Sequence, residues 1–254
     1  MKGSALRHEI TPSPNHEPRK HGQNPTILLL HYTGMDSSDA SLRRLCDPAA
    51  KVSCHYLVDE HGKIVQLVGE DERAWHAGLA CWCGLSDINS ASIGIEIQNI
   101  GHNGDYPDFN EAQMRSIVGL CRDIVTRHSI RNEMVLAHSD VAPARKADPG
   151  EKFDWRSLHD AGIGHWVEPS TATGGTILGP GDTGRSVLEL QQALLNYGYC
   201  IQLTGIFDIA TQDVVRAFQR HFHPARVDGL ADAATVETLK LLQSALPISS
   251  AGTS

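Results

Sequence analysis

A short, wholly apolar run places the strongest limit on the fold of this chain. Residues 26–30 read Thr-Ile-Leu-Leu-Leu, and the sequence His-Tyr-Thr-Gly follows at once as residues 31–34. A run of this length and composition predicts a strand that is buried on both faces of a sheet. His31 would then lie at the end of this strand, where side chains enter a cleft.

Strict alternation in residues 92–99 predicts a second strand. Ile93, Ile95 and Ile97 occupy one face, and Glu96 lies on the opposite face. Glu96 would therefore be held on a stiff strand away from the isoleucine core, which suits a general base. The alternative is a surface-facing polar residue on a one-sided sheet.

Strand and helix patterns alternate around these two strands. Residues 53–68 predict a hairpin, and the apolar stripe of residues 110–127 predicts a helix. Asn110 would cap that helix, with Gln113 in the position of a capping box. Residues 135–137 return as a strand. We therefore expect an α/β fold, in which helices flank a mixed central sheet.

The C-terminal part of the chain predicts a separate small domain. Residues 169–180 form a polar linker rich in Gly, Pro and Thr, and the segment 205–211 is echoed by 229–235. In each copy an aspartate would cap the next helix. With a further helix over about residues 186–197, this gives a three-helix domain. The predicted organisation begins with a loosely ordered lead-in at 1–24 and a larger α/β domain at 25–168. The linker at 169–180, the three-helix domain at 181–246 and a tail at 247–254 follow.

Composition and charge narrow the classes of partner and compartment. The 254 residues include 22 Lys and Arg against 30 Asp and Glu, and the net charge of -8 argues against a nucleic-acid partner. No stretch is apolar enough to span a membrane, and residues 1–20 lack the apolar core of a signal peptide. The sequence as it stands predicts a cytoplasmic location, with the periplasm or cell envelope as the alternative. The six cysteines are sparse for a disulfide framework, and we expect reduced thiols.

The stretch 137–150 carries the residues on which the chemistry depends. His138, Lys146 and Asp148 fall within it, and each of its two prolines biases the preceding residue toward an extended backbone. In an extended segment, side chains two residues apart point the same way, so Lys146 and Asp148 would face one cavity. A histidine and an aspartate beside a lysine suggest a hydrolytic metal site.

His31 would complete this site from a different part of the chain. Together with His138 and Asp148 it matches a catalytic zinc centre, which has three protein ligands and one open position. Glu96 would take a proton from the attacking water, and Lys146 would stabilise the oxyanion formed in amide hydrolysis. Taken singly, each of these residues has an alternative as an ordinary core or solvated side chain.

Five motifs of this sequence resemble one known family. The His-Tyr-Thr-Gly motif and four later motifs occur in the order seen in zinc N-acetylmuramoyl-L-alanine amidases of the type-2 amidase (AmpD/AmiD-like) family. The later motifs are residues 52–58, 73–78, 92–96 and 137–150. The likeness covers the larger domain, residues 25–168.

The resemblance implies a ligand set, catalytic residues and a reaction. It implies zinc on His31, His138 and Asp148, a catalytic Glu96, and Lys146 as the cation beside the oxyanion. The bond cleaved would be the amide between the lactyl group of N-acetylmuramic acid and L-alanine, in peptidoglycan or in intact or 1,6-anhydro muropeptides.

Four further residues are candidates for contact with the substrate. We expect Trp75 and His76 to line the cleft, with Asn99 and Lys51 as additional candidates. For His76 the alternative is a hydrogen-bonded core histidine.

Residues 181–246 resemble the three-helix type of peptidoglycan-binding domain. The alternative for this domain is a module that only packs against the catalytic domain. The whole chain is thus predicted to be a bacterial zinc amidase whose partner is peptidoglycan or a muropeptide. The alternative is a non-catalytic peptidoglycan-recognition protein on the same scaffold, and we assign no oligomeric state.

Overall fold

A six-stranded sheet forms the centre of the larger domain. The protein is described by a computed structural model covering residues 1–247, so residues 248–254 of the predicted tail lie outside the described residues. In spatial order the strands are β1 (Glu9–Ile10), β5 (Ile64–Gln66), β4 (Tyr56–Val58), β7 (Ser92–Ile97), β3 (Ile27–Tyr32) and β8 (Val135–Ala137). The pair β4–β5 is antiparallel, whereas β1–β5, β4–β7, β3–β7 and β3–β8 are parallel. The mixed sheet confirms the predicted α/β class.

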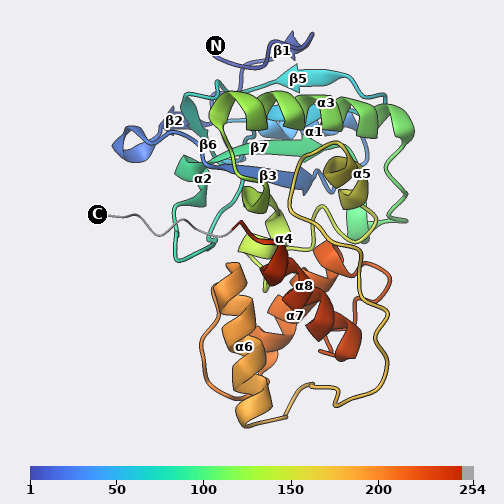
Figure 1. The fold of residues 1–254 in the computed structure, drawn as a ribbon. Helices are drawn as coiled ribbons and strands as arrows, with labels where there is room; N and C mark the ends of the chain where they lie inside the picture. The colour runs from blue at the N-terminus through green and yellow to red at the C-terminus, as the bar shows by residue number, and fades with distance from the viewer. Residues whose placement is uncertain (248–254) are drawn as a thin grey trace.

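Helices cover both faces of this sheet (Figure 1). The long helix α3 (Glu111–His128) shares a core with Leu28 and Leu30 of β3, while α1 (Ser38–Cys46) shares a second core with Leu57 of β4. The remaining short elements are β2 (His16–Pro18), η1 (Lys20–Gly22), β6 (Glu72–Ala74), α2 (Ile88–Ala91), η2 (Gly101–Asn103), η3 (Asn132–Met134), α4 (His138–Val141) and α5 (Trp155–Asp160). Because both faces of β3 are covered, its side chains are apolar throughout until His31.

The cap of α3 differs in one respect from the sequence prediction. The side chain of Asn110 accepts the backbone N–H of Gln113 at 2.9 Å, as expected of an N-cap. The side chain of Gln113 does not return to the cap. It donates instead to the carbonyl oxygens of Asp59 and Gln98, and so joins α3 to two loops of the sheet.

Three helices form the C-terminal domain, as the sequence predicts. They are α6 (Arg185–Tyr197), α7 (Ile209–Phe222) and α8 (Ala233–Ala245). Asp208 caps α7 and Asp232 caps α8, each through a hydrogen bond from a threonine N–H at 2.8 Å. Gly205 and Gly229 precede these caps with positive φ values of 66° and 76°, which is why the repeat contains glycine there.

The C-terminal domain docks against the larger domain, below the sheet as drawn in Figure 1. One continuous hydrophobic cluster contains Leu29 of β3 and Trp82 together with Val187 and Tyr199 of the C-terminal domain. Helix α4 of the larger domain packs on α7. The two domains therefore share a core, although the boundaries at 169–180 stay a prediction.

The structure corrects the prediction of reduced thiols. Cys81 and Cys200 form a disulfide that joins the two domains, while the other four cysteines, all within the described residues, are free thiols. The partners are 119 positions apart in sequence, so only the docking of the two domains brings them together.

The N-terminal residues are also more ordered than the predicted loose lead-in. β1 extends the sheet beside β5, and β2 pairs with β6. Arg19 is buried, and its guanidinium donates to the carbonyl oxygens of Glu70 and Ser90 at 3.0 and 2.7 Å. Among residues 1–247, no helix has the length and apolarity needed to cross a membrane.

Candidate active site

Three neighbouring parallel strands deliver side chains to one edge of the sheet. The register pairs His31 of β3 with Glu96 of β7, and β8 on the other side of β3 ends at Ala137. His138 therefore begins α4 directly at the carboxyl end of β8. Ligands of α/β proteins bind beyond the carboxyl ends of parallel strands, so the strand register itself brings these side chains to a binding edge.

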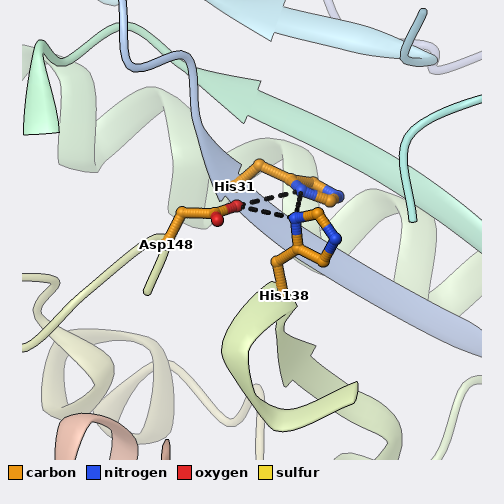
Figure 2. A group of neighbouring side chains, drawn as sticks. All are labelled: His31, His138 and Asp148. Atoms are coloured by element: carbon orange, nitrogen blue, oxygen red, sulfur yellow. Dashed lines mark hydrogen bonds and ion pairs between the residues drawn. The ribbon is translucent and has the colours of Figure 1, made fainter. Parts of the chain in front are cut away.

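Asp148 reaches the same place through the loop after α4. The backbone N–H of Ser139 donates to the carbonyl oxygen of Asp148 at 3.0 Å, which ties this loop to α4. Oδ2 of Asp148 lies 2.9 Å from Nδ1 of His138 and 3.1 Å from Nδ1 of His31, and the two Nδ1 atoms are 2.8 Å apart (Figure 2). All three side chains are buried. The structure thus brings the three predicted metal ligands together.

The tautomer of His138 is fixed by a backbone carbonyl. Nε2 of His138 lies 3.0 Å from the carbonyl oxygen of Ala77, which can only accept a hydrogen bond. Nε2 therefore carries the hydrogen, and Nδ1 presents a lone pair to the cluster. This contact could not be predicted from the sequence, because the partner is a main-chain atom 61 residues away.

The tautomer of His31 is fixed by a relay of side chains. The hydroxyl of Ser92 donates to the carbonyl oxygen of Ile88 at 2.6 Å, so its oxygen is left to accept Nε2–H of His76 at 3.3 Å. Nδ1 of His76 then accepts Nε2–H of His31 at 3.0 Å. As a result, Nδ1 of His31 also presents a lone pair to the cluster.

The electrostatics of this cluster favour the binding of a cation. Burial, reinforced by repulsion from His138, lowers the pKa of His31 to about 4, so this imidazole is neutral near pH 7. Burial acts to raise the pKa of Asp148, but the electrostatic interactions of this carboxyl with the rings of His138 and His31 outweigh burial and hold that pKa below its ordinary range. Two buried ring nitrogens with their lone pairs aimed at one point, beside an ionised carboxylate, form a site that a bound cation would complete.

The donor set fits zinc. Two imidazole nitrogens and one carboxylate oxygen lie within 4.8 Å of one another, and this set is typical of catalytic zinc sites with three protein ligands. Both histidines are oriented by a further hydrogen bond at the second ring nitrogen, as metal-bound histidines usually are.

A cavity of about 470 Å³ opens onto this cluster, and Glu96 and Lys146 line it beside Asp148. Within the described part of the chain, Oε2 of Glu96 is buried and has no hydrogen-bond partner. Burial, together with the negative charge of Asp148, raises the pKa of Glu96 well above its usual value, and Lys146 opposes this shift. The predicted convergence of Lys146, Asp148 and Glu96 on one cavity is therefore found, while their catalytic roles stay predictions.

Two of the predicted substrate contacts line the same cavity. Trp75 and His76 both face it, and His76 is at the same time the hydrogen-bond partner of His31. Gly94 of β7 makes room for His76, because a Cβ atom at this position would lie 2.6 Å from the ring. Lys51 lines an adjoining cavity of about 440 Å³ that shares Trp75, His76 and Lys146 with the first.

The role of Asn99 in substrate contact stays a prediction, and Arg145 was missed from the sequence. The Asn99 side chain is absent from the cavity lining: it donates to the carbonyl oxygen of Pro107 and accepts the N–H of Gly101, both at 2.9 Å, and so closes a loop. Arg145 lines both cavities and donates to the carbonyl oxygen of Ala77 at 3.1 Å. Its position next to Lys146 was the only signal for it in the sequence.

Fold and site together are those of an α/β protein with a candidate metal site, of the type that zinc hydrolases use. Comparison with known proteins agrees with this class: the family described as N-acetylmuramoyl-L-alanine amidase matches residues 21–151, and a peptidoglycan-binding domain matches residues 183–239. The chain is 40% identical over 225 residues to the N-acetylmuramoyl-L-alanine amidase AmiD of Escherichia coli, which covers 82% of this chain and 79% of AmiD. This chain belongs to the N-acetylmuramoyl-L-alanine amidase family.

Solved structures agree with this assignment. The complex of Escherichia coli AmiD with the substrate anhydro-N-acetylmuramic acid-L-Ala-D-gamma-Glu-L-Lys has a TM-score of 0.76 and 35% identity, covering 90% of this chain and 92% of AmiD. AmpDH3 from Pseudomonas aeruginosa has a TM-score of 0.75 and 29% identity, covering 98% of this chain and 99% of AmpDH3. Both structures cover the C-terminal domain as well as the larger domain, since each spans nine tenths or more of the chain.

Proposed function

We propose that this chain hydrolyses the amide bond between N-acetylmuramic acid and L-alanine, using zinc held by His31, His138 and Asp148. The observation that carries the proposal is the convergence of two Nδ1 lone pairs and a carboxylate at the floor of a cavity that Glu96 and Lys146 also line. The substrate class is supported by the AmiD complex, whose ligand contains this bond.

Zinc, when bound, supplies the Lewis acidity that makes water a nucleophile near neutral pH. Residues of the chain would carry out the proton transfer and stabilise the developing charge. Glu96 accepts the proton of the attacking water, and its raised pKa suits it to hold that proton and pass it to the leaving amine. Lys146 places a positive charge in the cavity, where it stabilises the negative charge that develops on the carbonyl oxygen.

The C-terminal domain indicates peptidoglycan as a second binding partner, in addition to the substrate in the active site. The match to a peptidoglycan-binding domain over residues 183–239 favours binding of peptidoglycan by this domain. The core that it shares with the larger domain indicates that it also packs, so the two alternatives considered for this domain are compatible.

For the compartment we propose the periplasm or cell envelope, the second of the two alternatives. The disulfide between Cys81 and Cys200 supports this choice, because disulfides persist in oxidising compartments and are rare in the cytosol.

The decisive test is digestion of purified sacculi and of soluble anhydro-muropeptides, read by mass spectrometry, with the wild type and a Glu96→Gln variant. We expect the wild type to release stem peptides that begin with L-alanine, a metal chelator to abolish this release, and added zinc to restore it. Binding to sacculi without release by the zinc-loaded wild type would overturn the proposal in favour of a recognition protein.

A further inference from the structure

The C-terminal domain makes two hydrogen bonds to the helix that carries the metal ligand His138. The hydroxyl of Tyr199 donates to Oδ1 of Asp140 at 2.8 Å, and Nδ1 of His221 lies 2.7 Å from Oδ2 of the same carboxylate. Because a carboxylate only accepts here, Nδ1 of His221 carries the hydrogen. All three side chains are buried, with at most 2% of their surface exposed.

Asp140 occupies the third position of α4, two residues after His138. Its Oδ2 also accepts the backbone N–H of Ala137 at 2.8 Å, which is the bond that caps the start of this helix. Helix α4 has only four residues, so its own hydrogen bonds are too few to fix its position. Its placement depends on contacts with the rest of the chain, which include those of Asp140 and the hydrogen bond from the N–H of Cys81 to the carbonyl oxygen of Val141 at 2.8 Å.

The same helix places two of the three metal ligands. His138 is its first residue, and the N–H of Ser139 holds the carbonyl oxygen of Asp148. A shift of α4 would therefore move both His138 and Asp148 relative to His31, which is fixed separately on β3. In Figure 1, α4 lies between the sheet and the C-terminal helices.

The ring of His221 is held firmly in place. It stacks on Trp155 of the larger domain with ring centroids 3.7 Å apart and on Phe222 with centroids 3.8 Å apart. The donor that faces Asp140 is thus preorganised by aromatic rings on both sides.

We propose that Tyr199 and His221 are positioning residues for the metal centre, so that the C-terminal domain sets the affinity of His138 and Asp148 for zinc. This inference rests on the proposed function. Loss of a hydrogen bond that orients a metal ligand typically weakens metal binding by about 10- to 100-fold. Because Tyr199 and His221 act through Asp140, we expect a loss near the lower end, about tenfold for each.

Two pairs of variants of the full chain test this inference. Tyr199→Phe removes only the hydroxyl that faces Asp140. Its matched control is Tyr197→Phe, because Tyr197 is also buried at the end of α6 but its hydroxyl contacts Nδ1 of His165 at 2.8 Å. At His221, phenylalanine keeps the stacked ring and loses the donor, whereas asparagine loses the ring and keeps an N–H near the position of Nδ1.

The measurement is the zinc dissociation constant, obtained by competition with a chromophoric chelator, with the absorption spectrum of the cobalt-loaded protein as a second readout. We expect Tyr199→Phe and His221→Phe to bind zinc about tenfold more weakly, with altered cobalt spectra, and Tyr197→Phe and His221→Asn to stay within about twofold of wild type. If His221 only stabilises the fold through its stacked ring, His221→Asn should instead bind zinc more weakly than His221→Phe.

Equal zinc affinity of Tyr199→Phe and Tyr197→Phe, or weaker zinc binding by His221→Asn than by His221→Phe, would overturn the inference and leave the proposed function intact. A wild-type chain that binds zinc no better than its His31→Ala variant would instead overturn the metal centre itself, and this inference with it.

Discussion

Removal of the disulfide between Cys81 and Cys200 tests the docking of the two domains. The bond joins cysteines 119 positions apart. In the chain-entropy relation a loop of this size lowers the entropy of the unfolded chain by about 16 cal/mol/K, or about 5 kcal/mol at 25 °C. Measured effects usually fall below this relation, so we expect Cys81→Ser/Cys200→Ser to lower the free energy of unfolding by about 2 to 5 kcal/mol.

The contacts around the disulfide determine whether the variant without it stays folded. Trp82 follows Cys81, and Tyr199 precedes Cys200. The two residues form an isolated antiparallel bridge, and their rings pack edge to face with centroids 4.9 Å apart. The N–H of Cys83 also donates to the carbonyl oxygen of Gly198 at 2.8 Å. Because these contacts remain in the variant, we expect it to stay folded with its domains docked.

Urea unfolding followed by tryptophan fluorescence measures the change, and Cys83→Ser is the matched control because Cys83 is an exposed free thiol near the bond. Titration of the unreduced wild type in denaturant should detect four thiols, those of Cys46, Cys54, Cys83 and Cys121. Six reactive thiols, or equal stability of the double variant and the control, would refute the reasoning.

Three further predictions concern the site and one buried ion pair. Glu96→Gln should bind zinc like the wild type and lose about 10²- to 10⁴-fold in kcat, measured on a soluble muropeptide. Asp148→Asn should weaken zinc binding by more than about a hundredfold in the chelator competition. Arg127 and His128 outweigh burial and lower the pKa of Glu70 from 4.5 to about 2, so the stability they give is complete above pH 4.5 and declines as pH falls toward 2. Urea titrations at pH 5 and near pH 2 should differ by about 3 kcal/mol more in the wild type than in Glu70→Gln.

Each of these three predictions has an outcome that would contradict it. Near-normal turnover by Glu96→Gln would remove Glu96 as the base, and zinc affinity of Asp148→Asn equal to wild type would remove Asp148 as a ligand. If the wild type and Glu70→Gln lose the same stability between pH 5 and pH 2, the carboxylate of Glu70 is not the group that titrates.

The parts of the fold that could be predicted from the sequence are those in which burial requires a regular pattern of apolar residues. β3 and β7 were found because a doubly buried strand is wholly apolar and because alternate residues of β7 face α3. Helices α7 and α8 were found because each has an apolar stripe, a capping aspartate and a preceding glycine turn. These constraints act within a few residues, so they are visible locally.

The missed features depend on contacts between distant segments. β1 is two exposed residues that become a strand only beside β5, and Cys81 meets Cys200 only after the domains dock. The amide of Asn99, a candidate for substrate contact, forms hydrogen bonds at both ends within the loop after β7, which the neighbouring sequence does not indicate. Such outcomes follow from tertiary packing rather than from spacing.

The two carboxylates of the site illustrate how position alone separates chemical roles. Asp148 comes from a loop and faces the ring nitrogens of His31 and His138, and its interactions with these rings keep its pKa low. Glu96 is fixed on β7 in register with His31, where burial and the charge of Asp148 raise its pKa. A low pKa suits a ligand that never releases its metal to a proton, and a raised pKa suits a group that must gain and lose one. The proposed division of work between ligand and base therefore follows from which element carries each carboxylate.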